Sequence, residues 1–154
     1  MSSDEETFRR LLTELRLLEG TTEALQNRTS LVNAAMTELA FASATIEGLG
    51  KEKVGAPLLV PIGGGSFIKA EAATTDTLVV GMGAGVSVEK PREEAKQIVD
   101  KRIAELEKSM TALQQQLGQV MERMRANRQQ LDDVSLRLSG KRGTGDVRET
   151  QGGA

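Results

Sequence analysis

Hydrophobic residues recur at alternating steps of three and four along the first third of the chain. Twelve positions follow this spacing, of which nine are apolar and three are Ser or Thr. They are Phe8, Leu11, Leu15, Leu18, Thr22, Leu25, Thr29, Val32, Met36, Leu39, Ser43 and Ile46. Such spacing is the a/d seam of a heptad repeat, which in a coiled coil faces the partner helix. The pattern predicts a coiled-coil helix over residues 4–48.

A second seam of the same kind runs through the C-terminal part. Eleven of its twelve positions are apolar, and the exception is Asn127. They are Val99, Ile103, Leu106, Met110, Leu113, Leu117, Val120, Met124, Asn127, Leu131, Val134 and Leu138. Pro91 suits a first helical residue and Gly140 a stop. We therefore predict a second coiled-coil helix over residues 91–139.

The two seams have equal numbers of layers, so the two helices can pair along their whole length. Two ordinary amphipathic helices in a short bundle are the alternative. Strict heptads, and the lack of a third helical pattern to pack against, favour the coiled coil. Because the connection joins the end of one helix to the start of the next, the pairing is expected to be antiparallel. Both chain ends would then lie at an open tip.

Residues 51–90 between the seams have a different pattern. Short apolar runs alternate with glycine clusters at residues 63–65 and 81–85, which predicts two consecutive β-hairpins. The glycines could instead cradle a phosphate. That use needs a helix directly behind them, whereas residues 86–88 alternate like a strand, and no Gly-Lys-Ser/Thr follows. Hairpin turns are therefore the better interpretation.

The predicted hairpins form an oligomerisation module. Isolated hairpins are marginally stable and leave open edges, so we expect them to pair with sheets of other subunits. The residues predicted at this interface are Leu58, Val60, Ile62, Phe67, Ile68, Leu78, Val79, Val80, Val86 and Val88. The resulting fold class is α+β: a long antiparallel two-helix coiled-coil hairpin with two β-hairpins between the helices. Residues 140–154 are Gly-rich and polar and are expected to be a disordered tail.

The predicted open tip carries more apolar residues than its seam needs. Leu12, Leu17 and Leu136 lie off the seam, and surplus apolar surface suggests use by a partner. Wider packing within the tip is the alternative. The residues predicted to contact varied partners at the tip are Phe8, Leu11, Leu12, Leu15, Leu17, Leu18, Leu131, Val134, Leu136 and Leu138. Asn127 within this region either fixes the register of the helices or is simply exposed.

Composition narrows the function. The 154 residues contain no Cys and no His, which removes the thiol nucleophile, the commonest general base and the commonest metal ligand, so we expect no enzyme, metal or cofactor. Arg123, Arg125 and Arg128 form the densest basic group, but acidic residues flank them and no aromatic residue offers a stacking platform. A solvated flank is favoured over nucleic-acid binding. No apolar run is long enough to span a membrane, and a cytoplasmic protein is expected.

Two stretches of sequence between the helices resemble those of a known protein family. Residues 59–70, LVPIGGGSFIKA, and residues 79–90, VVGMGAGVSVEK, resemble the two hairpins of the prefoldin alpha subunit, particularly its archaeal form. The resemblance covers roughly residues 5–140. It implies that the two β-hairpins join an oligomeric β-barrel platform at the centre of a hexamer of two alpha and four beta subunits. It further implies holding of unfolded client proteins without ATP and their delivery to a group II chaperonin. A structural coiled-coil tether or assembly adaptor with specific partners is the alternative function.

Overall fold

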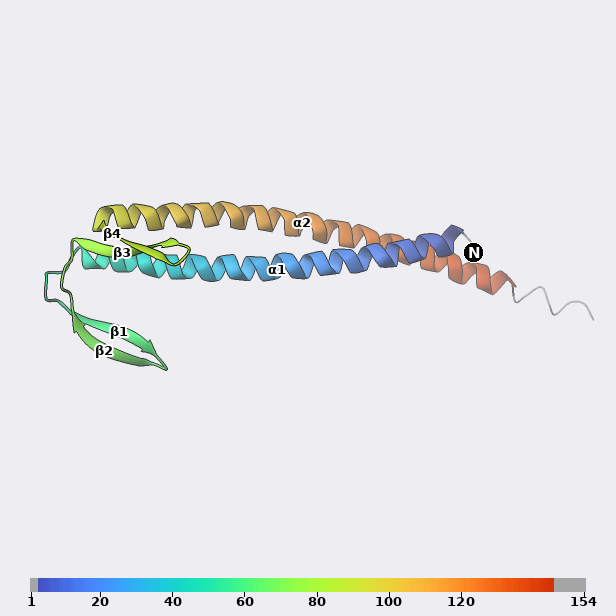
Figure 1. Ribbon diagram of the computed structural model, residues 1–154. Helices are drawn as coiled ribbons and strands as arrows, with labels where there is room; N and C mark the ends of the chain where they lie inside the picture. Colours follow the sequence, from blue (N-terminus) through green and yellow to red (C-terminus); the bar gives the residue numbers. More distant parts are fainter. Residues whose placement is uncertain (1–2, 146–154) are drawn as a thin grey trace, which may run out of the picture. The chain divides into compact units, whose positions relative to one another are not determined.

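The computed structural model describes residues 3–145. Two helices flank four strands, in the order helix, two hairpins, helix (Figure 1). The elements are α1 (Ser3–Leu49), β1 (Pro57–Gly63), β2 (Ser66–Glu71), β3 (Thr77–Gly83), β4 (Val86–Pro91) and α2 (Arg92–Gly145). The expected α+β class, with two antiparallel β-hairpins between two coiled-coil helices, is confirmed.

The contacts divide the chain into two units, which α1 and α2 both traverse. The terminal unit consists of residues 1–31 and 111–154, and the hairpin unit consists of residues 32–110. In the terminal unit Arg123 pairs with Glu14 at 3.2 Å and Arg137 pairs with Asp4 at 3.5 Å. In the hairpin unit Ser43 bonds to Asp100 at 2.8 Å, and Gly50 at the end of α1 lies against the side chain of Arg92 at the start of α2. Each unit therefore holds α1 and α2 antiparallel.

The predicted seams are the faces on which the helices meet. All twelve seam positions of α1 and all twelve of α2 are buried or half-buried. Most other helical positions are exposed, because a two-helix coil covers only one stripe of each helix. The seam prediction is confirmed, including Asn127, which is buried at 4% exposure.

The two hairpins share one turn design. In each, a two-residue loop follows a register shift, with Gly63 opposite Ser66 and Gly83 opposite Val86. Both central residues of each loop have positive φ: +58° and +72° in the first hairpin, +51° and +75° in the second. That combination is a type I′ turn, which matches the twist of paired strands and favours glycine. The glycine clusters are thus turns between strands.

The second hairpin packs on the helices of its unit. Val80 of β3 joins Ile46 of α1 with Ala95 and Val99 of α2 in a buried cluster. The Arg102 guanidinium also donates a 2.6 Å hydrogen bond to the carbonyl of Gly81. Every residue of β1 is exposed, as is nearly every residue of β2. The helices thus support β3 and β4, while the first hairpin buries almost none of its own surface.

Two predicted boundaries differ from the structure. Pro91 ends β4, opposite Thr77, and α2 begins at Arg92. The second helix does not stop at residue 139 but continues to Gly145, so the first residues of the expected disordered tail are helical. An ion pair from Lys141 to Asp4 of α1 favours this extension, although Gly140 has a poor helix propensity. Residues 146–154 of the expected tail lie outside the described residues.

Candidate functional site

A small apolar cluster closes the coil where α1 begins and α2 ends. Leu11, Leu131 and Val134 are buried in it, at 2%, 8% and 3% exposure. Phe8, Leu12, Leu15 and Leu138 pack against them and are half-buried. We call these seven residues the terminal cluster. Leu12 belongs to it although it lies off the seam, so the wider-packing interpretation holds for that residue.

Other residues predicted at the tip lie differently. Leu18 is buried in the seam at 6% exposure. Leu17 and Leu136 face solvent, at 69% and 72% exposure. These two leucines are therefore the predicted tip residues that a partner can reach without any change in the coil.

A groove of about 350 Å³ lies beside the terminal cluster. Its apolar part comes from Phe8 of α1 and Leu138 of α2. Its other lining residues are Glu5, Arg9, Ser135 and Ser139. A lining that combines two large apolar side chains with charged and hydroxyl side chains suits a short amphipathic peptide segment rather than a small charged metabolite.

Asp4 links the first turn of α1 to the last turns of α2. Its carboxylate pairs with the Arg137 guanidinium at 3.5 Å and with the Lys141 ammonium. The hydrogen bond from Lys141 and the charges of both cations hold the pKa of Asp4 below its ordinary value. This latch was not among the predicted site residues. The sequence does contain a signal for it. The first turn of α1 is acidic and the last turns of α2 carry Arg137 and Lys141, and antiparallel pairing brings these two ends together.

Asn127 is the one polar seam residue whose side chain finds no partner in the described part of the chain. Neither its Oδ1 nor its Nδ2 makes a hydrogen bond, although both atoms are buried. Thr22 and Thr29 instead donate to backbone carbonyls of their own helix, and Ser43 bonds across to α2. The exposure interpretation of Asn127 is therefore wrong.

The basic group on α2 is paired with acidic residues. Arg123 pairs with Glu14, Arg128 with Glu19, and Arg125 with Glu122. All of these side chains remain substantially exposed. The arrangement is that of a solvated coiled-coil flank, as the sequence indicated, rather than a surface of unpaired cations for phosphates.

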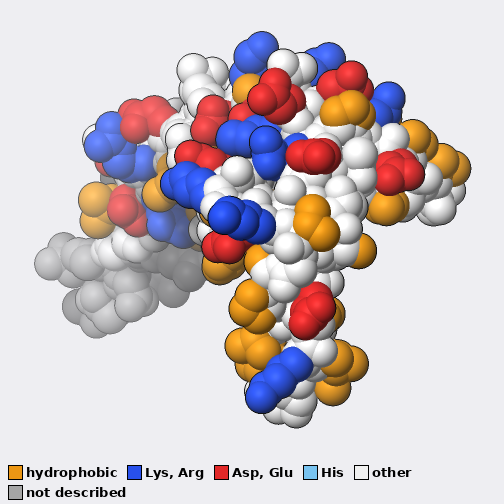
Figure 2. Space-filling view, turned by 90° about the vertical axis from the view of Figure 1, so that its left-hand side faces the viewer, with side chains coloured by type: hydrophobic (Ala, Val, Ile, Leu, Met, Phe, Trp, Pro, Cys, Tyr) orange, Lys and Arg blue, Asp and Glu red, His pale blue; other side chains and the backbone are white. Residues whose placement is uncertain are grey.

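The hairpin unit carries a second apolar surface. Eight of the ten predicted interface residues are exposed, at 38% to 73%. They are Leu58, Val60, Ile62, Phe67, Ile68, Val79, Val86 and Val88, and the prediction omitted the equally exposed Leu59 and Met82. Figure 2 shows hydrophobic side chains gathered along both sides of the lower lobe, which is the first hairpin. A soluble domain rarely leaves a hairpin apolar on both faces unless another chain covers it.

Two predicted interface residues are placed elsewhere. Val80 is buried at 7% exposure against α1 and α2 of its own subunit. Leu78 packs half-buried against the same cluster. Strand alternation puts both on the covered face of β3, opposite to Val79. Val80 is therefore removed from the interface prediction, because its side chain is already covered.

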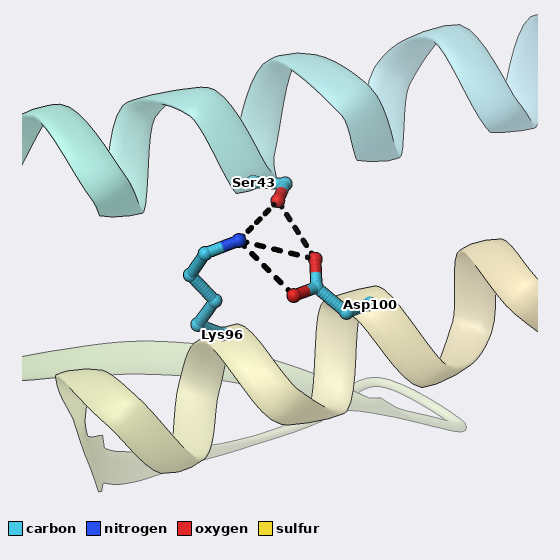
Figure 3. A network of polar contacts seen from close by, with 3 residues as sticks. All are labelled: Ser43, Lys96 and Asp100. Carbon is cyan, nitrogen blue, oxygen red and sulfur yellow. Dashed lines mark hydrogen bonds and ion pairs between the residues drawn. The ribbon is translucent and has the colours of Figure 1, made fainter.

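A polar network fixes the coil beside the second hairpin. The Ser43 hydroxyl donates to the Asp100 carboxylate at 2.8 Å, and the Lys96 ammonium donates to Ser43 and to Asp100, each at 3.0 Å (Figure 3). The hydrogen bonds from Ser43 and Lys96 hold the pKa of Asp100 below its ordinary value. The network joins α1 to α2 within the hairpin unit.

Two further features concern metal binding and membrane crossing. Within residues 3–145, no group of three or more His, Cys, Asp or Glu residues gathers as a metal site. No helix in that part of the chain combines the length and the apolar character that a membrane crossing requires.

Known proteins with similar sequences identify the family of this chain. The family described as prefoldin subunit matches residues 18–136. The prefoldin alpha subunit of Methanobrevibacter smithii is 32% identical over 119 residues, covering 77% of this chain and 80% of that protein. The Pyrococcus horikoshii alpha subunit is 27% identical over 140 residues, covering 90% and 95%.

A solved structure agrees in fold. The chain matches a subunit in the cryo-EM structure of filamentous PFD from Methanocaldococcus jannaschii with a TM-score of 0.64. The match has 23% identity and covers 74% of this chain and 94% of the other. The fold, with two antiparallel hairpins between coiled-coil helices, agrees with the family match over most of the chain. The chain belongs to the prefoldin family, and both of the relatives named above are prefoldin alpha subunits.

Proposed function

We propose that the chain is the alpha subunit of an ATP-independent holdase. In this proposal the hairpins assemble it with beta subunits, two alpha with four beta, into a β-barrel platform. The terminal unit holds unfolded client proteins in the cytoplasm and passes them to a group II chaperonin. Membership of a family of chaperone subunits supports the proposal, as do the relatives named as alpha subunits. No catalytic step is required of the chain.

The first hairpin supports the assembly step. Its apolar side chains are exposed on both faces, and its two strands form a sheet of their own with two open edges. Pairing with strands of other subunits would satisfy those edges and cover residues such as Ile62 and Phe67. The second hairpin can contribute Val79, Val86 and Val88, which lie on strands that the helices already support.

The terminal unit supports the holding step, and one observation carries it. Leu17 and Leu136 are large apolar side chains at about 70% exposure, outside the seam that the coil needs. The groove floored by Phe8 and Leu138 adds a recessed apolar contact. Unfolded polypeptides differ from folded ones chiefly in exposed apolar side chains, so such a surface would favour them. The charged residues Glu5 and Arg9 beside it would keep the empty surface soluble.

ATP has no evident place in this mechanism. Each glycine cluster forms a type I′ turn that returns directly into a strand. A phosphate cradle would need the amino end of a helix at that point. We therefore expect holding to be the same with and without ATP.

The test replaces the two exposed leucines. The double variant Leu17→Ser, Leu136→Ser keeps the seam and the hairpins, so the assembly should still elute at its original size. Each lost contact is worth roughly 1.5–3 kcal/mol when a client buries it. If a client covers even one of the two leucines, its affinity should fall roughly tenfold or more, and suppression of the aggregation of a chemically unfolded protein should need correspondingly more chaperone.

Leu31→Ser is the matched control. Leu31 is as exposed as Leu136, at 72%, and lies on α1 outside the predicted tip residues. It should leave both size and holding unchanged. If the double variant assembles normally and holds as well as the original chain, the leucines are not the client surface, and a tether with specific partners becomes the better function.

A further inference from the structure

The two edges of the first hairpin are not equivalent. Along an antiparallel strand, the backbone N–H and C=O groups of one residue face the paired strand and those of the next residue face outward. Ala72, just beyond β2, donates its N–H to the carbonyl of Ala56 at 3.0 Å, so its groups face β1. Alternation from that point turns the groups of Phe67, Lys69 and Glu71 outward, together with those of the β1 residues opposite them. Each edge of the hairpin therefore has three outward positions.

Prolines occupy two of the three outward positions of β1. These positions are Pro57, Leu59 and Pro61. Proline has no N–H, so this edge can donate only from Leu59, whereas the edge of β2 can donate from all three of its positions. A strand laid along β1 would keep two carbonyls unpaired, and a strand laid along β2 would pair every one. The edge of β1 is thus protected from strand addition, and the edge of β2 is open.

The second hairpin offers no edge that is equally complete. Arg92, just beyond β4, donates its N–H to the Asp76 carbonyl at 2.7 Å, and the same alternation turns the groups of Gly81 outward on β3. The Gly81 carbonyl already accepts a 2.6 Å hydrogen bond from Arg102 of α2. On β4 an outward position is occupied by Pro91. Among the four strands that the structure describes, β2 is therefore the one whose outward positions are all available for a ladder.

The side chains of β2 indicate the kind of strand that fits this edge. Phe67 and Ile68 lie on opposite faces, at 57% and 53% exposure, so both faces have an apolar residue to cover. Lys69 and Glu71 share the face of Phe67, are exposed, and make no ion pair within residues 3–145. Opposite charges on an added strand would pair with both. The edge thus fits a strand with apolar residues on both faces and an acidic and a basic residue two positions apart.

We propose that a strand of a partner subunit adds to the outer edge of β2, and that β1 forms the end of the resulting sheet. This inference rests on the proposed function and deepens its assembly step. It gives the assembly a direction, because the first hairpin of each copy offers one complete edge instead of two. A barrel built from these hairpins would have its weakest seam along β1. The prolines of β1 would also oppose open-ended growth of the sheet.

Hydrogen exchange of single backbone amides tests the edge directly. The full-length chain is measured alone at low concentration and after mixing with prefoldin beta subunits. In the free chain the outward amides of Phe67, Lys69, Glu71 and Leu59 should all exchange rapidly. In the assembly the three β2 amides should slow by roughly tenfold or more, whereas the Leu59 amide should remain fast.

A pair of proline substitutions provides a second test. Leu59 and Lys69 lie directly opposite each other, and neither donates its N–H to the other strand. Lys69→Pro should raise the dissociation constant of the assembly roughly tenfold or more, whereas the matched control Leu59→Pro should leave it unchanged. Lys69→Ala keeps the N–H and loses only the charge, so its effect should be smaller than that of Lys69→Pro. Slow exchange of the Ile68 amide, which faces β1, verifies that each variant keeps its hairpin.

Several results would overturn the proposal. One is a slow Leu59 amide beside fast β2 amides in the assembly, and another is an equal loss of assembly in Lys69→Pro and Leu59→Pro. A loss in Lys69→Ala as large as that in Lys69→Pro would assign the contact to the side chain instead of the backbone edge. Where a proline variant loses its hairpin, the exchange pattern of the original chain decides. If the original chain forms no assembly at all, the assembly step of the proposed function is itself wrong, which native mass spectrometry distinguishes from a wrong edge.

Discussion

The Ser43 hydroxyl donates a 2.8 Å hydrogen bond to the carboxylate of Asp100, across the seam from α1 to α2. Ser43 occupies a position that an apolar residue would normally fill, yet both of its hydrogen-bonding capacities are used, since it also accepts from Lys96. A polar seam residue is stable when its partners are built in. Asn127 is the contrasting case in the terminal unit.

Ser43→Ala should destabilise the hairpin unit by about 1 kcal/mol, because it removes a hydrogen bond to a charged group and leaves Asp100 with Lys96 alone. Denaturant unfolding followed by circular dichroism measures this change. Thr45→Ala is the control, since the Thr45 hydroxyl bonds only to the Phe41 carbonyl of its own helix. Equal effects of the two substitutions would mean that the bond between the helices contributes nothing.

Acid should loosen the coil through Asp4 and Asp100. Both have a pKa below the ordinary aspartate value of about 3.9. Their stabilising contacts are therefore fully present above that pH and are lost as the pH falls through the lowered pKa values. Between pH 5 and 8 these groups should leave the melting temperature unchanged. Below about pH 4 the melting temperature should fall.

Asp4→Asn tests the contribution of the latch to this behaviour. The variant should melt at a lower temperature than the original chain at neutral pH, and the difference should shrink as the pH falls below about 4. A difference that stays constant down to strongly acidic pH would show that the Asp4 charge is not the stabilising element.

The seams and hairpins could be predicted because each depends on the spacing of residues that are close together in the sequence. Every seam position is covered as expected, since a 3.5-residue repeat leaves one stripe to bury. The pattern did not determine which surface covers each apolar residue of the hairpins, the helices of the same chain or another subunit. Alternation along β3 separates Val79 from Val80, but only the packed structure shows that Val80 meets Ile46 and Val99. The burial of Asn127 and the helical residues after Gly140 likewise depend on the opposite helix.

The two turns offer a paired substitution. Ala84 has a φ of +51°, a left-handed conformation in which its Cβ is strained, whereas the equivalent residue of the first hairpin is Gly64, at +58°. Ala84→Gly should stabilise the second hairpin by roughly 0.5–1 kcal/mol, and Gly64→Ala should destabilise the first by a similar amount. Hydrogen exchange of the strand amides measures both. The same sign for both changes would contradict the turn assignment.

Val79 and Val80 are adjacent on β3 and should separate assembly from stability. Val80→Ala removes buried methyl groups from the cluster with Ile46, Ala95 and Val99, so the free energy of unfolding of the chain should fall by about 2 kcal/mol. Val79→Ser changes a side chain at 73% exposure, so helix content should stay the same while native mass spectrometry shows smaller assemblies. Phe41→Ser, at an equally exposed position of α1, controls for general loss of apolar surface and should leave assembly intact. If Val79→Ser assembles normally while Phe41→Ser does not, the partner subunits contact α1 rather than the outer face of β3. The prediction that Val79 lies at the subunit interface would then be wrong.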